Sequence, residues 1–143
     1  MNIGHYFDFV HTSYEFQSEK PESAMFDAAI AKVPGAAPST AYHIGDSISK
    51  DVGGAAAAGW MGIRYKQWFD EELPDWSSIE SKEEADQGQE KRQALMLWGR
   101  KDTSSGLDWV EVWGIDDILT LFGFPEDDSK PIRATYIRGF LDD

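Results

Sequence analysis

One short apolar run, residues 42–45 (YHIG), ends at an acidic residue and leads into a stretch rich in glycine and alanine. The run predicts a buried β-strand with Asp46 at its C-terminal tip, where open α/β sheets build their ligand sites. Asp51 follows five residues later, in the first turn of a helix predicted over 50–58. Two carboxylates held in this way suit a hard cation such as Mg²⁺, which takes oxygen ligands. Helix capping by Asp46 or Ser47 is the simpler interpretation, but it explains one acid and not the pair.

Strand and helix patterns alternate along the first 66 residues. A strand is predicted over 6–12, and a helix over 21–33 starts at a proline, which is favourable in the first helical position. Two more strands, 40–45 and 61–65, flank the helix at 50–58. This β-α-β-α-β order predicts an α/β fold with a parallel, doubly wound sheet and helices on both of its faces.

These residues resemble two motifs of the haloacid-dehalogenase-like (HAD-like) hydrolases, most of which are Mg²⁺-dependent phosphatases that work through an aspartyl-phosphate. The segment 45–51 (GDSISKD) resembles the family's fourth motif, Gly-Asp with a second Asp five positions on. Lys20, followed by proline at the start of a helix, resembles the third motif. The resemblance covers residues 3–66 and implies a Rossmann-like sheet of the HAD type.

The resemblance also implies a role for three residues. Lys20 would be catalytic and substrate-binding, since the family's lysine stabilises the nucleophilic aspartate and offsets the charge of the phosphoryl group. Asp46 would be a Mg²⁺ ligand, and Asp51 a second ligand or a group that orients the metal's waters. Ser47 is more simply a helix cap than a catalytic group, and His43, inside its strand, more simply a packed core histidine than a base.

The family's first motif, an apolar strand ending in Asp-x-Asp, is not found in this sequence. The nearest imitation, at 110–120, has Ile118 where the second carboxylate should stand. The second motif and the cap domain are expected upstream of the strand at 6–12, where only a few residues remain. The chain therefore resembles the C-terminal half of such an enzyme. We expect it to be inactive by itself, with Mg²⁺ binding weak or absent.

The resemblance implies a gap in the sheet as well. In the family, two further strands lie between those corresponding to 6–12 and 40–45, which leaves three inter-strand steps, or about 14 Å. Three ways to close this gap remain open. The strand at 6–12 pairs directly with the strand at 40–45, which a right-handed crossover through the helix at 21–33 allows. Alternatively, the chain pairs with a second copy of itself or with a complementing N-terminal polypeptide.

The rest of the chain is less regular. Between Asp70 and Glu90 there are nine acids and one lysine, a composition too polar for a core layer, so this segment is expected to be mobile. A strand at 109–114 and a helix at 116–122 follow, and a short amphipathic helix is predicted in the tail from Ile132 to Leu141. The expected organisation is a HAD-like core at 1–66, an insertion at 67–106, the last core strand and helix at 107–124, and a tail at 125–143.

Composition excludes several classes of partner and site. A net charge of −13 opposes binding to nucleic acid or to an anionic membrane. The sequence has no cysteine, and its three histidines show no zinc-ligand spacing. No apolar stretch is long enough for a membrane span and no signal region is found, so we expect an intracellular, cytoplasmic protein.

Two functional classes remain open at this point. The first is part of a phosphatase-type hydrolase, acting on phosphoric monoesters, whose N-terminal half is encoded elsewhere or lost from this version of the chain. The second is a non-catalytic HAD-like relic that acts as a protein-interaction module. The reading frame upstream of Met1 would separate them, because the first class requires a strand ending in Asp-x-Asp.

Overall fold

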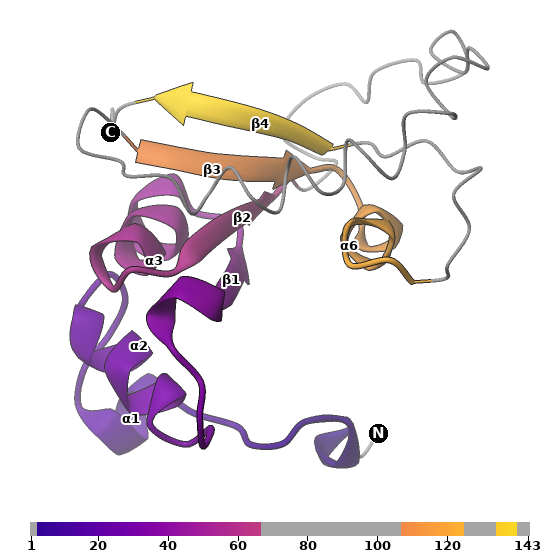
Figure 1. The fold of residues 1–143 in the computed structure, drawn as a ribbon. Helices are drawn as coiled ribbons and strands as arrows, with labels where there is room; N and C mark the ends of the chain where they lie inside the picture. The colour runs from indigo at the N-terminus through magenta and orange to yellow at the C-terminus, as the bar shows by residue number, and fades with distance from the viewer. Residues whose placement is uncertain (1–2, 67–106, 125–133, 140–143) are drawn as a thin grey trace, which may run out of the picture.

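The computed structural model of the chain describes residues 3–66, 107–124 and 134–139 (Figure 1). The acidic segment at 67–106, and with it the expected mobility of residues 70–90, lies outside these described residues, as does most of the tail. Among the described helices none is long and apolar enough to cross a membrane.

Four strands form one sheet in the order β1-β2-β3-β4 (Figure 1). The strand β1 (Tyr42–Gly45) runs parallel to β2 (Met61–Tyr65), and β2 runs parallel to β3 (Leu107–Val112). The predicted parallel pairing of 41–45 with 61–65 is therefore confirmed, and the helical segment between the two strands explains it, because a parallel pair needs a crossover connection.

The tail contributes a strand where the sequence predicted a helix. Residues of β4 (Ala134–Gly139) pair antiparallel with β3, with Tyr136 opposite Val110. The prediction of a helix is wrong for this segment, because its threonine, tyrosine and isoleucine favour extended backbone and the edge of β3 offers a ladder of partners. The sheet is thus parallel with one antiparallel edge strand.

Helices cover both faces of the sheet, as predicted. The π-helix η3 (Ile48–Gly53) continues into α3 (Gly54–Ala57), and together they occupy most of the helix predicted at 50–58. On β2, Gly62 lies against Val52 of η3, since a Cβ added to this glycine would come 3.1 Å from the Val52 Cα.

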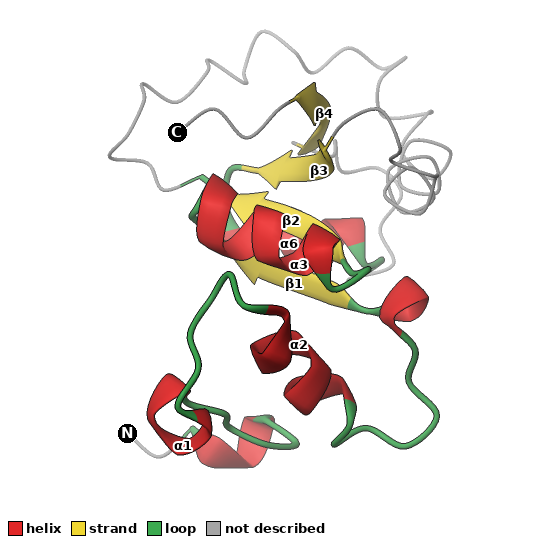
Figure 2. Cartoon of the chain, turned by 90° about the vertical axis from the view of Figure 1, so that its left-hand side faces the viewer, coloured by secondary structure: helices red, strands yellow, loops and turns green. Residues whose placement is uncertain are grey.

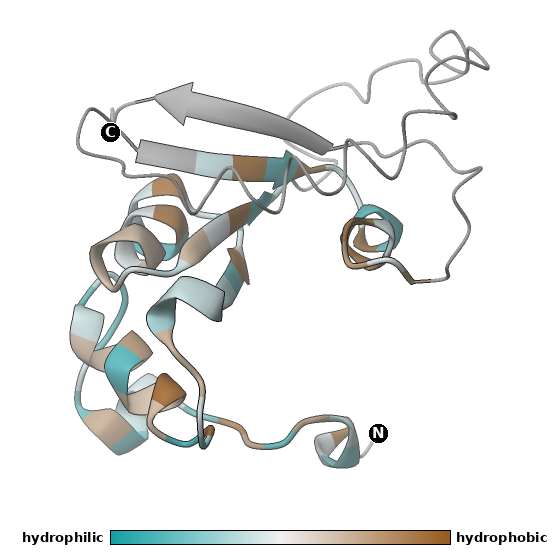
Figure 3. Ribbon diagram, in the orientation of Figure 1, coloured by the Kyte–Doolittle hydropathy of each residue, from teal (hydrophilic) through white to brown (hydrophobic). Residues whose placement is uncertain are grey.

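The opposite face of β2 contacts α6 (Ile115–Leu121). In Figure 1, α3 and α6 lie on opposite sides of the strands, so they overlap in the view of Figure 2, which is turned by 90°. Figure 3 shows a hydrophobic and a hydrophilic side on α6. The buried cluster between α6 and the sheet consists of Met61, Ile63, Val110, Val112, Ile118 and Leu121.

The N-terminal segment does not form the strand predicted at 6–12. A short 3₁₀-helix η1 (Gly4–Tyr6) is followed by backbone without strand pairing as far as α1 (Ser13–Phe16). Tyr6, Phe7 and Val10 are exposed. A strand is stable only with a neighbour to complete its hydrogen bonds, and this segment has none among the described strands.

The helix α2 (Ser23–Ile30) lies inside the range predicted at 21–33 and joins this N-terminal part to the sheet layer. Phe26 is the buried residue of α2 and packs against α3 at Gly54. A Cβ on Gly54 would come 2.8 Å from the Phe26 ring and 3.0 Å from the Pro21 Cα. This close approach fixes the residues just before α2, including Lys20, beside the start of the helix that follows β1. The short 3₁₀-helix η2 (Pro38–Thr40) leads into β1.

Candidate functional site

Asp51 is the buried centre of the site. It lies in the first turn of η3 and only 3% of its surface is exposed. Its carboxylate rests against the C-terminal residue of β1, because a Cβ added to Gly45 would overlap the carboxylate carbon. A glycine at the end of the strand is therefore a packing requirement for this placement of the acid.

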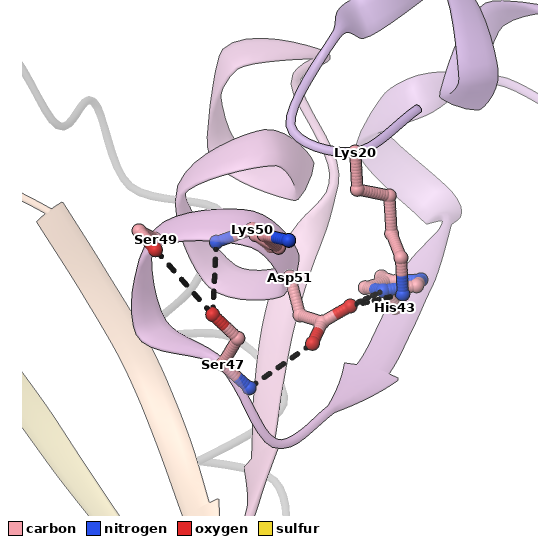
Figure 4. Close-up of polar contacts among 6 residues, drawn as sticks. All are labelled: Lys20, His43, Ser47, Ser49, Lys50 and Asp51. Atoms are coloured by element: carbon pink, nitrogen blue, oxygen red, sulfur yellow. Dashed lines mark hydrogen bonds and ion pairs between the residues drawn. The ribbon is translucent and has the colours of Figure 1, made fainter. Parts of the chain in front are cut away.

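Three donors meet the Asp51 carboxylate (Figure 4). The Lys20 ammonium and the His43 Nε2 atom both contact Oδ1, the latter at 2.8 Å, and the Ser47 backbone amide donates to Oδ2 at 3.0 Å. Burial alone would raise the pKa of Asp51, but the hydrogen bonds from these donors outweigh burial and hold that pKa below its ordinary value. The acid is therefore ionised at neutral pH.

Lys20 reaches this acid from the residues that precede α2, 31 positions earlier in the chain. The contact brings Lys20 to the end of β1 that Asp46 directly follows, as the sequence predicted. The Lys20 side chain is 40% exposed, whereas that of Asp51 is 4% exposed. One end of the ion pair is thus buried and the other opens toward solvent.

Asp46 differs from Asp51 in its exposure and in the partners of its side chain. Its side chain is exposed and makes no hydrogen bond or ion pair with another described residue, while its backbone carbonyl accepts a hydrogen bond from Arg64 Nε at 3.2 Å. Both oxygens of Asp51 already accept hydrogen bonds from protein donors. Within the described part of the chain no group of three or more acidic, histidine or cysteine residues is placed to hold a metal ion. The proposed magnesium pair of Asp46 and Asp51 stays a prediction.

Ser47 caps the helix, as expected. Its hydroxyl oxygen accepts a hydrogen bond from the Lys50 backbone amide at 3.2 Å, and it lies 3.4 Å from the Ser49 hydroxyl. The side chain of Ser47 therefore orders the first turn of η3, and its backbone amide is left to meet Asp51.

A family model described as HAD-hydrolase-like matches residues 18–67, the segment that contains Lys20, Asp46 and Asp51. This segment is therefore similar to the HAD-like hydrolases. No curated protein sequence matches the chain. Among solved structures, one assigned as the HAD-hydrolase YfnB from Bacillus subtilis, bound to magnesium, is 21% identical, with a TM-score of 0.43. That match covers 50% of this chain and 31% of the YfnB chain.

His43 is a site residue of the HAD-like segment that the sequence interpretation missed. The sequence predicts a packed core histidine, and the His43 ring does pack edge-on against Phe26 at a centroid distance of 5.1 Å. Its Nε2 atom nevertheless bonds to Asp51. The available signal was the strand alternation, which puts residues 43 and 45 on the same face, toward the helix that carries Asp51.

A second polar cluster, also missed, lies beside the HAD-like motif on β2 and β3. Arg64 Nη1 donates to Glu111 Oε1 at 3.0 Å, Trp109 Nε1 donates to the same oxygen at 3.2 Å, and Lys66 Nζ lies 3.4 Å from Oε2. Burial alone would raise the pKa of Glu111, but these donors, Arg64 first, hold it below its ordinary value.

The acids of the segment at 110–120, which most nearly resembles the first motif, do not lie at the end of a strand. Asp116 and Asp117 lie in the first turn of α6 and not at the tip of a strand. The described residues therefore place a lysine and an exposed carboxylate at the C-terminal end of β1, and the two acids of α6 lie on a different element.

Proposed function

We propose that the chain supplies the C-terminal part of a phosphatase-type HAD-like hydrolase, with Lys20 as the residue that meets the phosphoryl group of the substrate. The observation that carries the proposal is the Lys20–Asp51 ion pair at the C-terminal end of β1. This ion pair brings together the regions that resemble the family's third motif, at Lys20, and its fourth motif, at Asp51.

The chemistry of the pair suits an anionic substrate. A lysine ammonium has three donors, and Asp51 takes one of them. Because 40% of the Lys20 side chain is exposed, its remaining donors are available to a phosphate oxygen. His43 and Ser47 hold the Asp51 carboxylate in one orientation beside Lys20. A positioned cation of this kind stabilises the negative charge that develops during phosphoryl transfer.

Magnesium does not fit the described residues by themselves. Asp46 is an exposed carboxylate without a side-chain partner among the described residues, whereas Mg²⁺ needs several oxygen ligands at nearly octahedral positions. We therefore propose Asp46 as one ligand of a site completed by oxygens from elsewhere, and we derive no step of the reaction through the metal. The chain alone is expected to bind Mg²⁺ weakly or not at all.

A nucleophile must also come from elsewhere, since the sequence contains no Asp-x-Asp. We propose that a complementing N-terminal polypeptide provides it. The outer edge of β1 is unpaired among the described strands, and Ile44 on this strand is 42% exposed. An unpaired edge with an exposed apolar side chain supports the addition of a further strand there.

The first experiment measures hydrolysis of an aryl phosphate by the purified 143-residue chain with Mg²⁺. We expect no turnover above a control without protein. Mg²⁺-dependent turnover that is abolished by Asp46→Asn would contradict the proposal that the nucleophile is supplied by another polypeptide. If the upstream reading frame encodes a strand ending in Asp-x-Asp, co-expression of that polypeptide should restore turnover, and Lys20→Met should abolish it.

One observation favours the second candidate, a non-catalytic interaction module. The N-terminal segment exposes Tyr6, Phe7, Val10 and Tyr14, the last of them to 92%. Exposed apolar residues within one short segment are consistent with a surface for protein association. Light scattering of the chain alone tests self-association: a dimer that becomes monomeric after Tyr14→Ser, without activity under any condition, would favour the module.

A further inference from the structure

Arg64 links the centre of the sheet to the residue that follows β1. Its Nε atom donates to the backbone carbonyl of Asp46 at 3.2 Å, and its Nη1 atom donates to Glu111 at 3.0 Å. One guanidinium thus spans from the loop beyond β1, across β2, to β3. Such a planar group with donors in fixed directions sets the relative positions of its two acceptors.

The register of the sheet makes this bridge possible. Arg64 stands opposite Gly45 on one side and opposite Glu111 on the other. Glu111 is 8% exposed and also accepts a hydrogen bond from Trp109. Because this carboxylate is buried and held by two donors, the guanidinium has a fixed anchor at the β3 end.

We propose that Arg64 is a positioning residue that fixes the loop at residues 46–47, and with it Asp46 and the amide of Ser47. Its relevance to catalysis rests on the function proposed above, but the positioning itself does not. Ser47 is the local reporter, since its amide donates to Asp51 and belongs to the residue next to Asp46.

Lys66 offers a matched control within the same cluster. It lies 3.4 Å from the other oxygen of Glu111 and packs over the Trp113 ring at 4.6 Å. Removal of either cation weakens the neutralisation of Glu111. Removal of Arg64 also breaks its hydrogen bond to the Asp46 carbonyl.

The experiment is amide hydrogen exchange by NMR on the 143-residue chain and its Arg64→Met, Arg64→Lys and Lys66→Met variants. The Ile63 amide, in the middle of β2, reports the stability of the sheet, and the Ser47 amide reports the loop. We expect exchange at Ser47, relative to Ile63, to become about tenfold faster in both Arg64 variants, which corresponds to about 1.4 kcal/mol. The ratio should not change in the Lys66 variant.

Two outcomes would overturn the proposal. An unchanged ratio in the Arg64 variants would show that the loop holds its position without the guanidinium. An equal rise in the Lys66→Met variant would assign the effect to the charge of Glu111. Arg64→Lys keeps a cation near Glu111, so the comparison stands even if Arg64→Met does not fold. Because the readout needs no substrate, its failure is distinguishable from a failure of the proposed function.

Discussion

Lys20 and Asp51 form an ion pair although 31 positions separate them in the chain, and only the aspartate is buried. The asymmetry has a consequence for stability. A buried carboxylate is costly to leave without partners, whereas a half-exposed ammonium is solvated when its partner is lost.

We therefore expect Lys20→Met to lower the free energy of unfolding by about 1–2 kcal/mol, measured by urea titration at pH 7. The value is below that for a fully buried pair, because Lys20 is partly exposed and His43 and Ser47 still donate to Asp51. Lys50→Met is the control, since it removes the same charge from an exposed residue of η3. An equal loss in both variants would argue against a specific role for the pair.

The lowered pKa of Asp51 predicts acid sensitivity. A carboxyl whose pKa is lower in the folded than in the unfolded state stabilises the protein above the unfolded value, about 3.9, and this contribution is lost as the pH falls through the folded value. The free energy of unfolding should decrease more steeply below pH 4 in the wild-type chain than in Asp51→Asn. Parallel curves for the two proteins would contradict the assigned direction. The pKa of Glu111 is lowered as well, so Glu111 also stabilises the folded protein above its unfolded pKa. Glu111→Gln should therefore remove a separate part of the acid-induced decrease in the free energy of unfolding.

Substitution of Gly45 tests the packing of the site. Gly45→Ala places a methyl group where the Asp51 carboxylate lies, so the acid must move away from Lys20 and His43. We expect a loss of at least about 3 kcal/mol, because overpacking and a disrupted buried charge act together. Gly35→Ala is the comparison: Gly35 has φ of +79° and open space around it, so only backbone strain of about 1 kcal/mol applies. Similar losses at both positions would show that Asp51 adapts freely.

Much of the segment around β1 could be predicted because its signals are local. The apolar run before Asp46, the Ser47 cap and the following helix are specified by neighbouring residues. The parallel pairing of β1 with β2 follows from the helix between them. The site of Lys20 was predicted only through resemblance to a family, since no local pattern tells which acid a distant lysine will meet.

The remaining features depend on contacts between distant segments. Residues 6–12 have the composition of a strand but no strand partner among the described residues, and β4 forms because the edge of β3 is available. Arg64 and Glu111 are 47 positions apart, and their contact depends on a register that the sequence does not reveal. The contact of His43 with Asp51 could not be predicted either, because it depends on how the helix after β1 packs against the strand.

Replacement by asparagine should affect stability strongly at Asp51 and very little at Asp46. Asp51→Asn should lower the free energy of unfolding by about 2 kcal/mol or more. The buried asparagine side chain carries no negative charge, so it accepts the hydrogen bonds from Lys20, His43 and Ser47 less favourably than the carboxylate does. Asp46→Asn should change it by less than about 0.5 kcal/mol, since the Asp46 side chain is exposed and has no partner among the described residues. Urea titrations of both variants at pH 7 give the comparison. An acid at the tip of a strand whose removal costs no stability is available for ligand binding, whereas a loss at Asp46 as large as that at Asp51 would assign it a structural role and remove it as a candidate metal ligand.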